Sequence, residues 1–119
     1  LRRQRQMCIR DRGRTKAEND MFRWTARLLH WRQGNEVITK GKQTQFIPQN
    51  GVYVIARSYN GKNVMTVING TSKAATMQAE RYAEIIGDAQ EATNILTGHK
   101  INISKDVKLA PRGVMVLEF

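Results

Sequence analysis

The stretch VYVIARSYNGKNVMTVIN, residues 52–69, decides the fold of this chain. Both of its halves, residues 52–57 and 64–69, show the two-residue alternation of side chains that is typical of a β-strand. Asn60-Gly61 stands between them. Asn-Gly is the strongest short hairpin signal, because both residues tolerate the positive φ of a type I′ turn. The stretch therefore predicts a β-hairpin.

Two more Asn-Gly pairs, at residues 50–51 and 69–70, extend this pattern. They stand ten residues before and nine residues after the central pair, which is the spacing of an antiparallel meander of short strands. The same alternation of side chains returns over residues 114–119. The sequence thus predicts several short antiparallel strands rather than one isolated hairpin.

Shorter β candidates fill the remainder of the chain, at residues 44–47, 73–78, 93–96, 100–103 and 107–109. Residues 80–87 are interpreted as a short helical turn. The predicted fold is therefore mainly β, with residues 43–119 forming an antiparallel β-sandwich of seven or eight strands.

The periodicity ahead of these strands is that of an amphipathic α-helix. Thr15 and Glu18 have the spacing of a capping box, in which the threonine hydroxyl accepts a hydrogen bond from the Glu18 amide. Gly34 is placed to end the helix in the left-handed conformation. We therefore expect a helix over residues 16–32. Its apolar stripe follows three- and four-residue steps through Met21, Trp24, Leu28 and Trp31.

Composition places the chain among globular domains and draws attention to charge. It has 119 residues and 13.6 kDa, enough for one domain, and no apolar run reaches the ~20 residues of a membrane-spanning helix. Its net charge is +10, which suggests a nucleic-acid partner or an anionic surface. Residues 1–16, however, hold seven basic side chains and one acid, so they carry +6 of that charge. The other 103 residues carry only +4, which weakens the case for a nucleic-acid binder.

The basic tail itself has two interpretations. It is either an arm that grips phosphates or a stretch that is not native. The string LRRQRQMCIRDR, residues 1–12, resembles a translated sequencing-adapter read, and the chain begins with Leu1 rather than Met. We therefore favour a non-native tail over residues 1–12, expect the native start to be missing, and exclude the tail from fold reasoning.

No group of residues has the arrangement of a catalytic, metal or cofactor site. His30 and His99 have no neighbour at metal-ligand spacing, and the single cysteine, Cys8, lies in the tail. Four acids gather on one segment and are interpreted as a solvated face, because paired carboxylates need a sugar-binding cleft between them to cleave glycosides: Glu80, Glu84, Asp88 and Glu91. We predict no catalytic residue, no metal and no cofactor.

Two alternatives of other classes stay open on the residues alone. A stand-alone carbohydrate-binding module would show a flat row of exposed aromatic side chains, drawn from Tyr53, Tyr59, Tyr82 or the tryptophan pair. A nucleic-acid-binding domain would show a basic stripe on its folded part. We favour neither, and expect no nucleic acid and no membrane among the partners.

The segments, taken in order, resemble the C-terminal part of α-amylase-family glycoside hydrolases. ENDMFRWTARLLHWR (18–32) resembles the last barrel helix of that family, and QGNEVITKG (33–41) resembles its connection to a C-terminal sandwich. Four further stretches resemble strands of that sandwich: FIPQNGVYVIAR (46–57), VMTVIN (64–69), NILTG (94–98) and PRGVMVLE (111–118). The cyclomaltodextrinase or neopullulanase type of Bacteroides-like bacteria is the most similar, over residues 13–119.

This resemblance implies a domain plan. Residues 13–33 would be the last helix of a truncated (β/α)₈ barrel, residues 34–42 a linker, and residues 43–119 the C-terminal β-sandwich. The stripe of Met21, Trp24, Leu28 and Trp31 would pack on the missing barrel, and an exposed stripe is what we expect without it.

The resemblance also implies a function. The parent enzyme would hydrolyse α-glucans or cyclodextrins, and this domain would stabilise its barrel without catalysing, with an optional weak α-glucan contact. The family's catalytic carboxylates precede this helix, and no acid here matches their motifs. The implied source is bacterial, and a periplasmic and a cytoplasmic location both fit.

Overall fold

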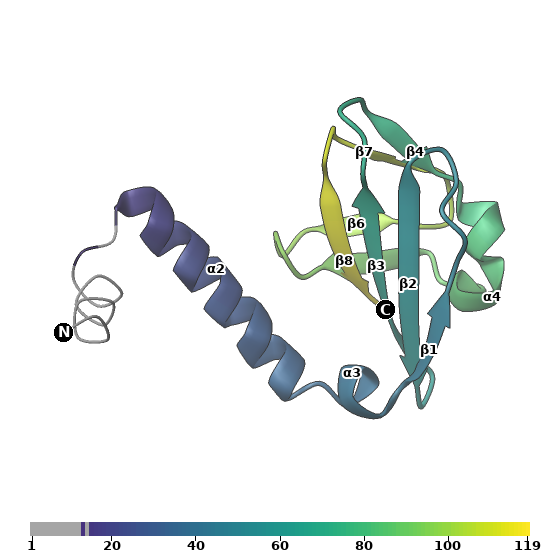
Figure 1. The fold of residues 1–119 in the computed structure, drawn as a ribbon. Coiled ribbons are helices and arrows are strands. Elements are labelled where there is room, and N and C mark those ends of the chain that lie inside the picture. The colour runs from purple at the N-terminus through teal and green to yellow at the C-terminus, as the bar shows by residue number, and fades with distance from the viewer. Residues whose placement is uncertain (1–12, 14) are drawn as a thin grey trace. The chain divides into compact units, whose positions relative to one another are not determined.

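The computed structural model describes residue 13 and residues 15–119 of the chain (Figure 1). The chain divides into two compact units, Leu1–Gly34 and Asn35–Phe119. The tail expected at residues 1–12, with Cys8, lies outside the described residues.

Helix α2, Lys16–Gln33, is the helix that the sequence predicts in the first unit. Its first turn is capped as expected, because the Thr15 hydroxyl accepts a hydrogen bond of 3.2 Å from the Glu18 amide. The end of the helix differs from the prediction. Gly34 has φ −90° and ψ 4°, so the expected left-handed conformation is wrong. The Gly34 amide instead donates to the His30 carbonyl at 3.4 Å, which continues the helical turn without a positive φ.

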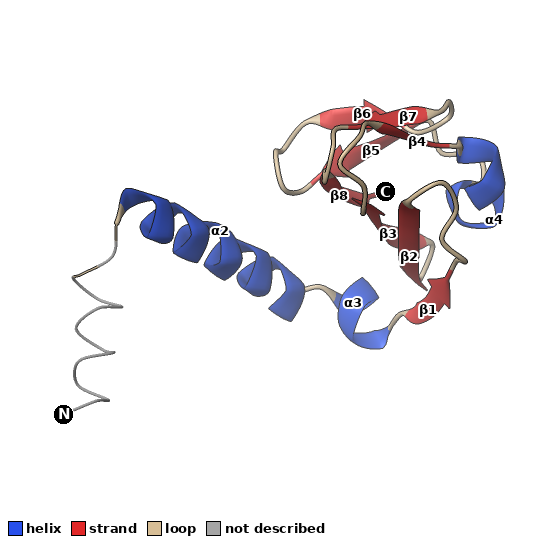
Figure 2. Cartoon of the chain, turned by 45° about the horizontal axis from the view of Figure 1, so that its top comes forward, coloured by secondary structure: helices blue, strands red, loops and turns tan. Residues whose placement is uncertain are grey.

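The second unit is built on a six-stranded antiparallel sheet (Figures 1 and 2). The strand order is β1-β2-β3-β8-β5-β6. These strands are β1 (Lys42–Gln45), β2 (Val52–Tyr59), β3 (Lys62–Asn69), β8 (Val114–Glu118), β5 (Glu91–Asn94) and β6 (Lys100–Asn102). Strands β4 (Ala75–Met77) and β7 (Val107–Leu109) pair as a separate antiparallel sheet. The predicted β-sandwich of seven or eight strands is confirmed.

The hairpin signals were right twice and wrong once. Asn60 and Gly61 have φ values of 50° and 77° and join β2 to β3 through a two-residue turn. Asn50 and Gly51, with φ values of 53° and 79°, form the same kind of turn ahead of β2. The pair at 69–70 does not continue the meander, because the chain leaves the sheet there and β8 takes the place beside β3.

Two short helices complete the second unit. The segment expected to connect helix and sandwich, residues 34–42, contains α3, Glu36–Lys40, whose first turn is capped by the Asn35 side chain. α3 contacts β2 and β3, so it belongs to the unit of the sheet. The helical turn predicted over residues 80–87 is confirmed as a 3₁₀ turn, η1 (Ala79–Tyr82), followed by α4 (Ala83–Ile86).

The core lies between the two sheets, with the β4–β7 pair opposite β2 and β3 (Figure 2). Alternate residues of β2, β3 and β8 point into it, as the two-residue period predicts. The buried core side chains of the strands include Val52, Val54, Ala56, Met65, Val67, Met77, Val107, Leu109, Met115 and Leu117. The sandwich thus carries its own hydrophobic core within Asn35–Phe119.

Candidate functional surfaces

The predicted stripe on α2 lies on a helix without a single buried residue. Met21 is 62% exposed and Trp24 is 37% exposed, while Leu28 and Trp31 are half-buried. Two further large apolar side chains, Phe22 and Leu29, widen the stripe on one side. They are 53% and 56% exposed. An apolar face of this breadth on a soluble helix marks a surface that packs against something else.

The remaining arc of α2 is polar and mostly basic. Lys16, Arg23, Arg27 and His30 follow one another at helical spacing, and all four are exposed. Such a polar arc is compatible with exposure to water. It also provides matched control positions for experiments on the stripe.

The acidic segment does not form a paired-carboxylate site. Glu80 lies in η1 and Glu84 in α4, and both are exposed. Asp88 and Glu91, which follow α4, are exposed as well. Their exposure agrees with the interpretation of this segment as a solvated face.

The tyrosines that the carbohydrate-binding alternative requires do not lie in one row. Tyr82 is 2% exposed and packs edge-on against Phe46, with ring centroids 4.8 Å apart, so it belongs to the core. Tyr53 and Tyr59 lie on β2 and are half-buried. The Tyr53 hydroxyl accepts a hydrogen bond from the Gln45 side-chain amide.

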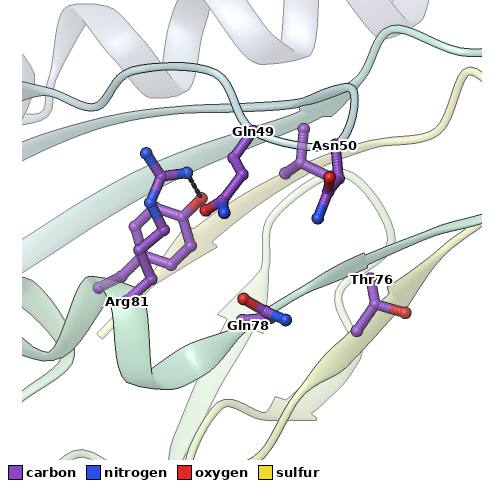
Figure 3. A pocket seen from close by; sticks show the side chains of 7 residues that line it. Gln49, Asn50, Thr76, Gln78 and Arg81 are labelled. Carbon is purple, nitrogen blue, oxygen red and sulfur yellow. Dashed lines mark hydrogen bonds between the residues drawn. The ribbon is translucent and has the colours of Figure 1, made fainter.

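A small polar hollow lies beside Tyr82 (Figure 3). Arg81 lines this hollow and donates a hydrogen bond of 2.6 Å to the Ile47 carbonyl, which ties η1 to the loop after β1. The space is about 10 Å³, enough for one water and far too small for a sugar ring. Its lining residues are Gln49, Asn50, Val52, Thr76, Gln78, Arg81 and Tyr82. We interpret Arg81 as a structural clamp.

The buried asparagine Asn69 explains the failed hairpin prediction. It is 1% exposed, and its amide nitrogen donates to the carbonyls of Lys73 at 2.7 Å and Ala110 at 3.0 Å. Its side-chain oxygen accepts from the Thr71 amide at 3.0 Å and from the Thr71 hydroxyl at 2.7 Å. These bonds hold together the two loops that flank the β4–β7 pair. Sequence reasoning took Asn69 for a turn residue, because nothing in the local sequence distinguishes the two roles.

Metal-ligating side chains do not gather in the described part of the chain. Within residues 13 and 15–119, no three His, Cys, Asp or Glu side chains lie close enough to hold a metal ion. His30 and His99 are both exposed. Over the same residues, every buried side-chain nitrogen and oxygen has a hydrogen-bond partner. None of the described helices is long and apolar enough to cross a membrane.

Solved structures share this fold at low sequence identity. AmyP, in a crystal structure with maltose, matches 87% of this chain with a TM-score of 0.71 and 17% identity. An Anoxybacillus α-amylase matches 83% with a TM-score of 0.64 and 17% identity, and the α-amylase of Geobacillus thermoleovorans in complex with acarbose matches 74% with a TM-score of 0.59 and 18% identity. The matched regions cover 21%, 22% and 20% of those chains, so this chain spans about a fifth of their length.

The family match is more specific than these likenesses in fold. Residues 43–118, more than half of the chain, match the family model of the cyclo-malto-dextrinase C-terminal domain. The matched range begins in β1 and ends with the last residue of β8, so it contains both sheets. The chain therefore belongs to the cyclo-malto-dextrinase C-terminal domain family, and its sandwich is a C-terminal domain of the α-amylase-family glycoside hydrolases.

Proposed function

We propose that this chain is the non-catalytic C-terminal part of an enzyme that hydrolyses α-glucans or cyclodextrins, and that it stabilises the catalytic barrel of that enzyme. Helix α2 is then the last helix of the barrel, and the sandwich is the domain that follows it. The stripe of Met21, Trp24, Leu28 and Trp31 packs on the barrel.

The observation that carries this proposal is the exposed apolar stripe of α2. The helix has 18 residues, and none of them is buried in the described structure. In proteins most of the stability of a helix comes from packing of its amphipathic face rather than from intrinsic propensity. A barrel surface would bury the stripe and stabilise it by about 25 cal/mol per Å² of apolar surface removed from water.

The likeness to solved enzymes supports the inclusion of α2. The AmyP match covers 87% of the chain, which is more than the 85 residues of Asn35–Phe119, so it extends into the segment that contains α2. The matched proteins were crystallised with maltose and with acarbose. Those ligands and the α-amylase names support an α-glucan substrate for the parent enzyme.

A non-catalytic role agrees with the chemistry of the described residues. The acids of the segment 80–91 are exposed, and the polar hollow near Arg81 holds no more than a water. A glycoside hydrolase needs two carboxyl groups about 5–10 Å apart on either side of a bound sugar. None of these acids lines the polar hollow near Arg81 or the apolar hollow on α2, which supports a barrel that carries the chemistry.

The test begins with the gene upstream of Gly13, which we expect to encode a barrel in the same reading frame. In the longer polypeptide, Trp24→Ala should lower the midpoint of heat inactivation of α-glucan hydrolysis by several degrees, because it removes a large apolar side chain from the interface. Arg23→Ala, on the polar arc of the same helix, is the matched control and should leave the midpoint within a degree.

Two results would contradict the proposal. One is an upstream sequence that encodes no barrel. The other is a Trp24→Ala enzyme whose heat inactivation matches that of Arg23→Ala, because the stripe would then contribute nothing to the stability of the barrel.

A further inference from the structure

The dipeptide Asn-Gly occurs three times in the second unit, and the fold gives each copy a different environment. The pairs stand at residues 50–51, 60–61 and 69–70. Asparagine is among the chemically labile residues of proteins, because its side-chain amide can be lost by deamidation. A following glycine favours this reaction, since it has no side chain to obstruct the attacking backbone nitrogen and its backbone moves most freely. The three pairs therefore place one reaction in three settings.

Deamidation begins at the backbone nitrogen of the glycine. Hydroxide removes its proton, and the nitrogen attacks the side-chain carbonyl carbon of the asparagine, so that a C–N bond forms and a succinimide ring closes. The bond from that carbon to the side-chain nitrogen breaks, and this nitrogen takes a proton from water and leaves as ammonia. Water then opens the ring at either carbonyl to give aspartate or isoaspartate, and nothing is oxidised or reduced. The reaction therefore needs a glycine nitrogen and an asparagine side chain that can both leave their native positions.

The Asn60-Gly61 turn restrains these groups least. Within the second unit, neither the Asn60 side chain nor the Gly61 amide takes part in a hydrogen bond. A Cβ built on Gly61 meets no atom within 4 Å, so the glycine is not packed against a neighbouring segment. The turn is the tip of the β2–β3 hairpin, next to the pair of Tyr59 and Lys62. Opening of this tip costs only local contacts, so we expect it to be the most frequent opening of the three.

The Asn50-Gly51 turn is restrained on its glycine side. The Gly51 carbonyl accepts a hydrogen bond of 2.9 Å from the Gly70 amide. A Cβ built on Gly51 would collide with the Thr71 side chain, so this glycine packs closely against the segment after β3. Movement of Gly51 would break that hydrogen bond and that packing. We therefore expect this turn to open less often than the Asn60-Gly61 turn.

The third pair is held on both sides. The Asn69 side chain is 1% exposed and makes the four hydrogen bonds described above. The Gly70 amide, which would have to lose its proton, donates to the Gly51 carbonyl. Succinimide formation at Asn69 would therefore require the loss of all these hydrogen bonds together, at the place where the two loops meet.

We propose that Asn60 is the deamidation site of this domain, that Asn50 reacts more slowly, and that the fold protects Asn69. Each conversion replaces a neutral amide with a carboxylate and lowers the net charge of +10 by one. Opening of the ring to isoaspartate also adds one carbon to the backbone, which lengthens the tight turn between β2 and β3. The proposal concerns the second unit alone and does not depend on the proposed function.

Peptide mapping tests all three positions at once. The native 119-residue chain is incubated in mildly alkaline buffer and digested with trypsin, and mass spectrometry follows the conversion of amide to acid. Cleavage after lysine and arginine places each pair in its own peptide, at residues 43–57, 58–62 and 63–73. We expect Asn60 to react about threefold to tenfold faster than Asn50 and at least about a hundredfold faster than Asn69. The rate at Asn60 should rise in proportion to the concentration of hydroxide.

The unfolded chain is the control for local sequence. In guanidinium chloride the three pairs should react at rates within about threefold of one another, because they share the dipeptide and no longer differ in structure. Thr71→Val, which removes a hydroxyl that donates to the Asn69 side chain, should speed deamidation of Asn69 at least about threefold and leave Asn60 unchanged. Ser104→Ala removes the matching hydroxyl beside the exposed Asn102 and should change neither rate.

Four outcomes would overturn the inference. An Asn60 that stays intact in the native chain but reacts in the unfolded chain would show that the turn itself protects it. An Asn50 that reacts faster than Asn60 would show that the contacts of Gly51 do not restrain the reaction. Equal native rates at Asn69 and Asn60 would show that the buried hydrogen bonds give no protection. A native order of rates that persists in guanidinium chloride would assign the differences to local sequence rather than to the fold.

Discussion

Helix α2 and the sandwich carry similar apolar side chains but differ in how far those side chains are buried. In the sandwich, Met65 and Val54 are completely buried in a core shared by two sheets. On α2, Met21 is 62% exposed and no residue is buried. Among the described residues, the sandwich buries its large apolar side chains, whereas α2 buries none. A difference of this kind is what the proposed function predicts for a domain with its own core and for a helix that packs on a barrel.

The two methionines make the largest expected contrast. Met65→Ala removes a fully buried side chain and should reduce the free energy of unfolding of the 119-residue chain by about 2–5 kcal/mol. Met21→Ala makes the same chemical change at an exposed position and should cost less than about 0.5 kcal/mol. Urea unfolding followed by the tyrosine signal reads the sandwich, since both tryptophans lie on α2. Equal losses for both variants would show that the helix is buried in solution.

Two asparagines sharpen the comparison at the level of hydrogen bonds. The Asn69 oxygen accepts from the amide and hydroxyl of Thr71, and the Asn102 oxygen accepts from the amide and hydroxyl of Ser104. Asn69 is buried and Asn102 is exposed. Asn69→Ala should cost about 2–3 kcal/mol, because it removes all four hydrogen bonds of a side chain that is 1% exposed, and Asn102→Ala less than about 1 kcal/mol. Similar costs in urea unfolding would mean that burial does not set the value of this motif.

The sequence predicted the local elements of both regions for physical reasons. Turn chemistry located the hairpin at Asn60-Gly61, and the capping pair of Thr15 and Glu18 located the start of α2. Both signals depend only on neighbours in the chain. The exposed stripe could be expected as well, because an apolar face at helical spacing needs a partner, wherever that partner lies.

The strand order could not be predicted in the same way. β8 lies beside β3 although 44 residues separate Asn69 from Val114, and pairing over such a distance leaves no local trace. Asn69 has the sequence context of a turn, yet its bonds to Lys73 and Ala110 form only after the loops have met.

The N-cap of α2 offers a smaller effect that is confined to one region. Thr15→Ala removes the hydroxyl that accepts from Glu18 and should destabilise the helix by about 1 kcal/mol. Far-ultraviolet circular dichroism of the chain should show less helix, while the tyrosine-detected midpoint of the sandwich stays fixed. Thr15→Ser, which keeps the hydroxyl, should restore the helical signal. A sandwich midpoint that moved with the cap would show that the two regions unfold together.

Gly34, at the boundary of the two units, should give the smallest effect and one of opposite sign. Its φ of −90° is open to any L-residue, and a Cβ built on it meets no atom within 4 Å. Gly34→Ala should therefore stabilise α2 by about 0.4–1 kcal/mol, mainly because alanine has less freedom than glycine in the unfolded chain. Gly61, with φ 77°, is the matched contrast, because Gly61→Ala places a side chain in a conformation that L-residues rarely adopt. If Gly34→Ala raised the helical signal and left the sandwich midpoint unchanged, the boundary would be a true joint between independent units. If it lowered the helical signal, the residue at position 34 would need the left-handed conformation in solution.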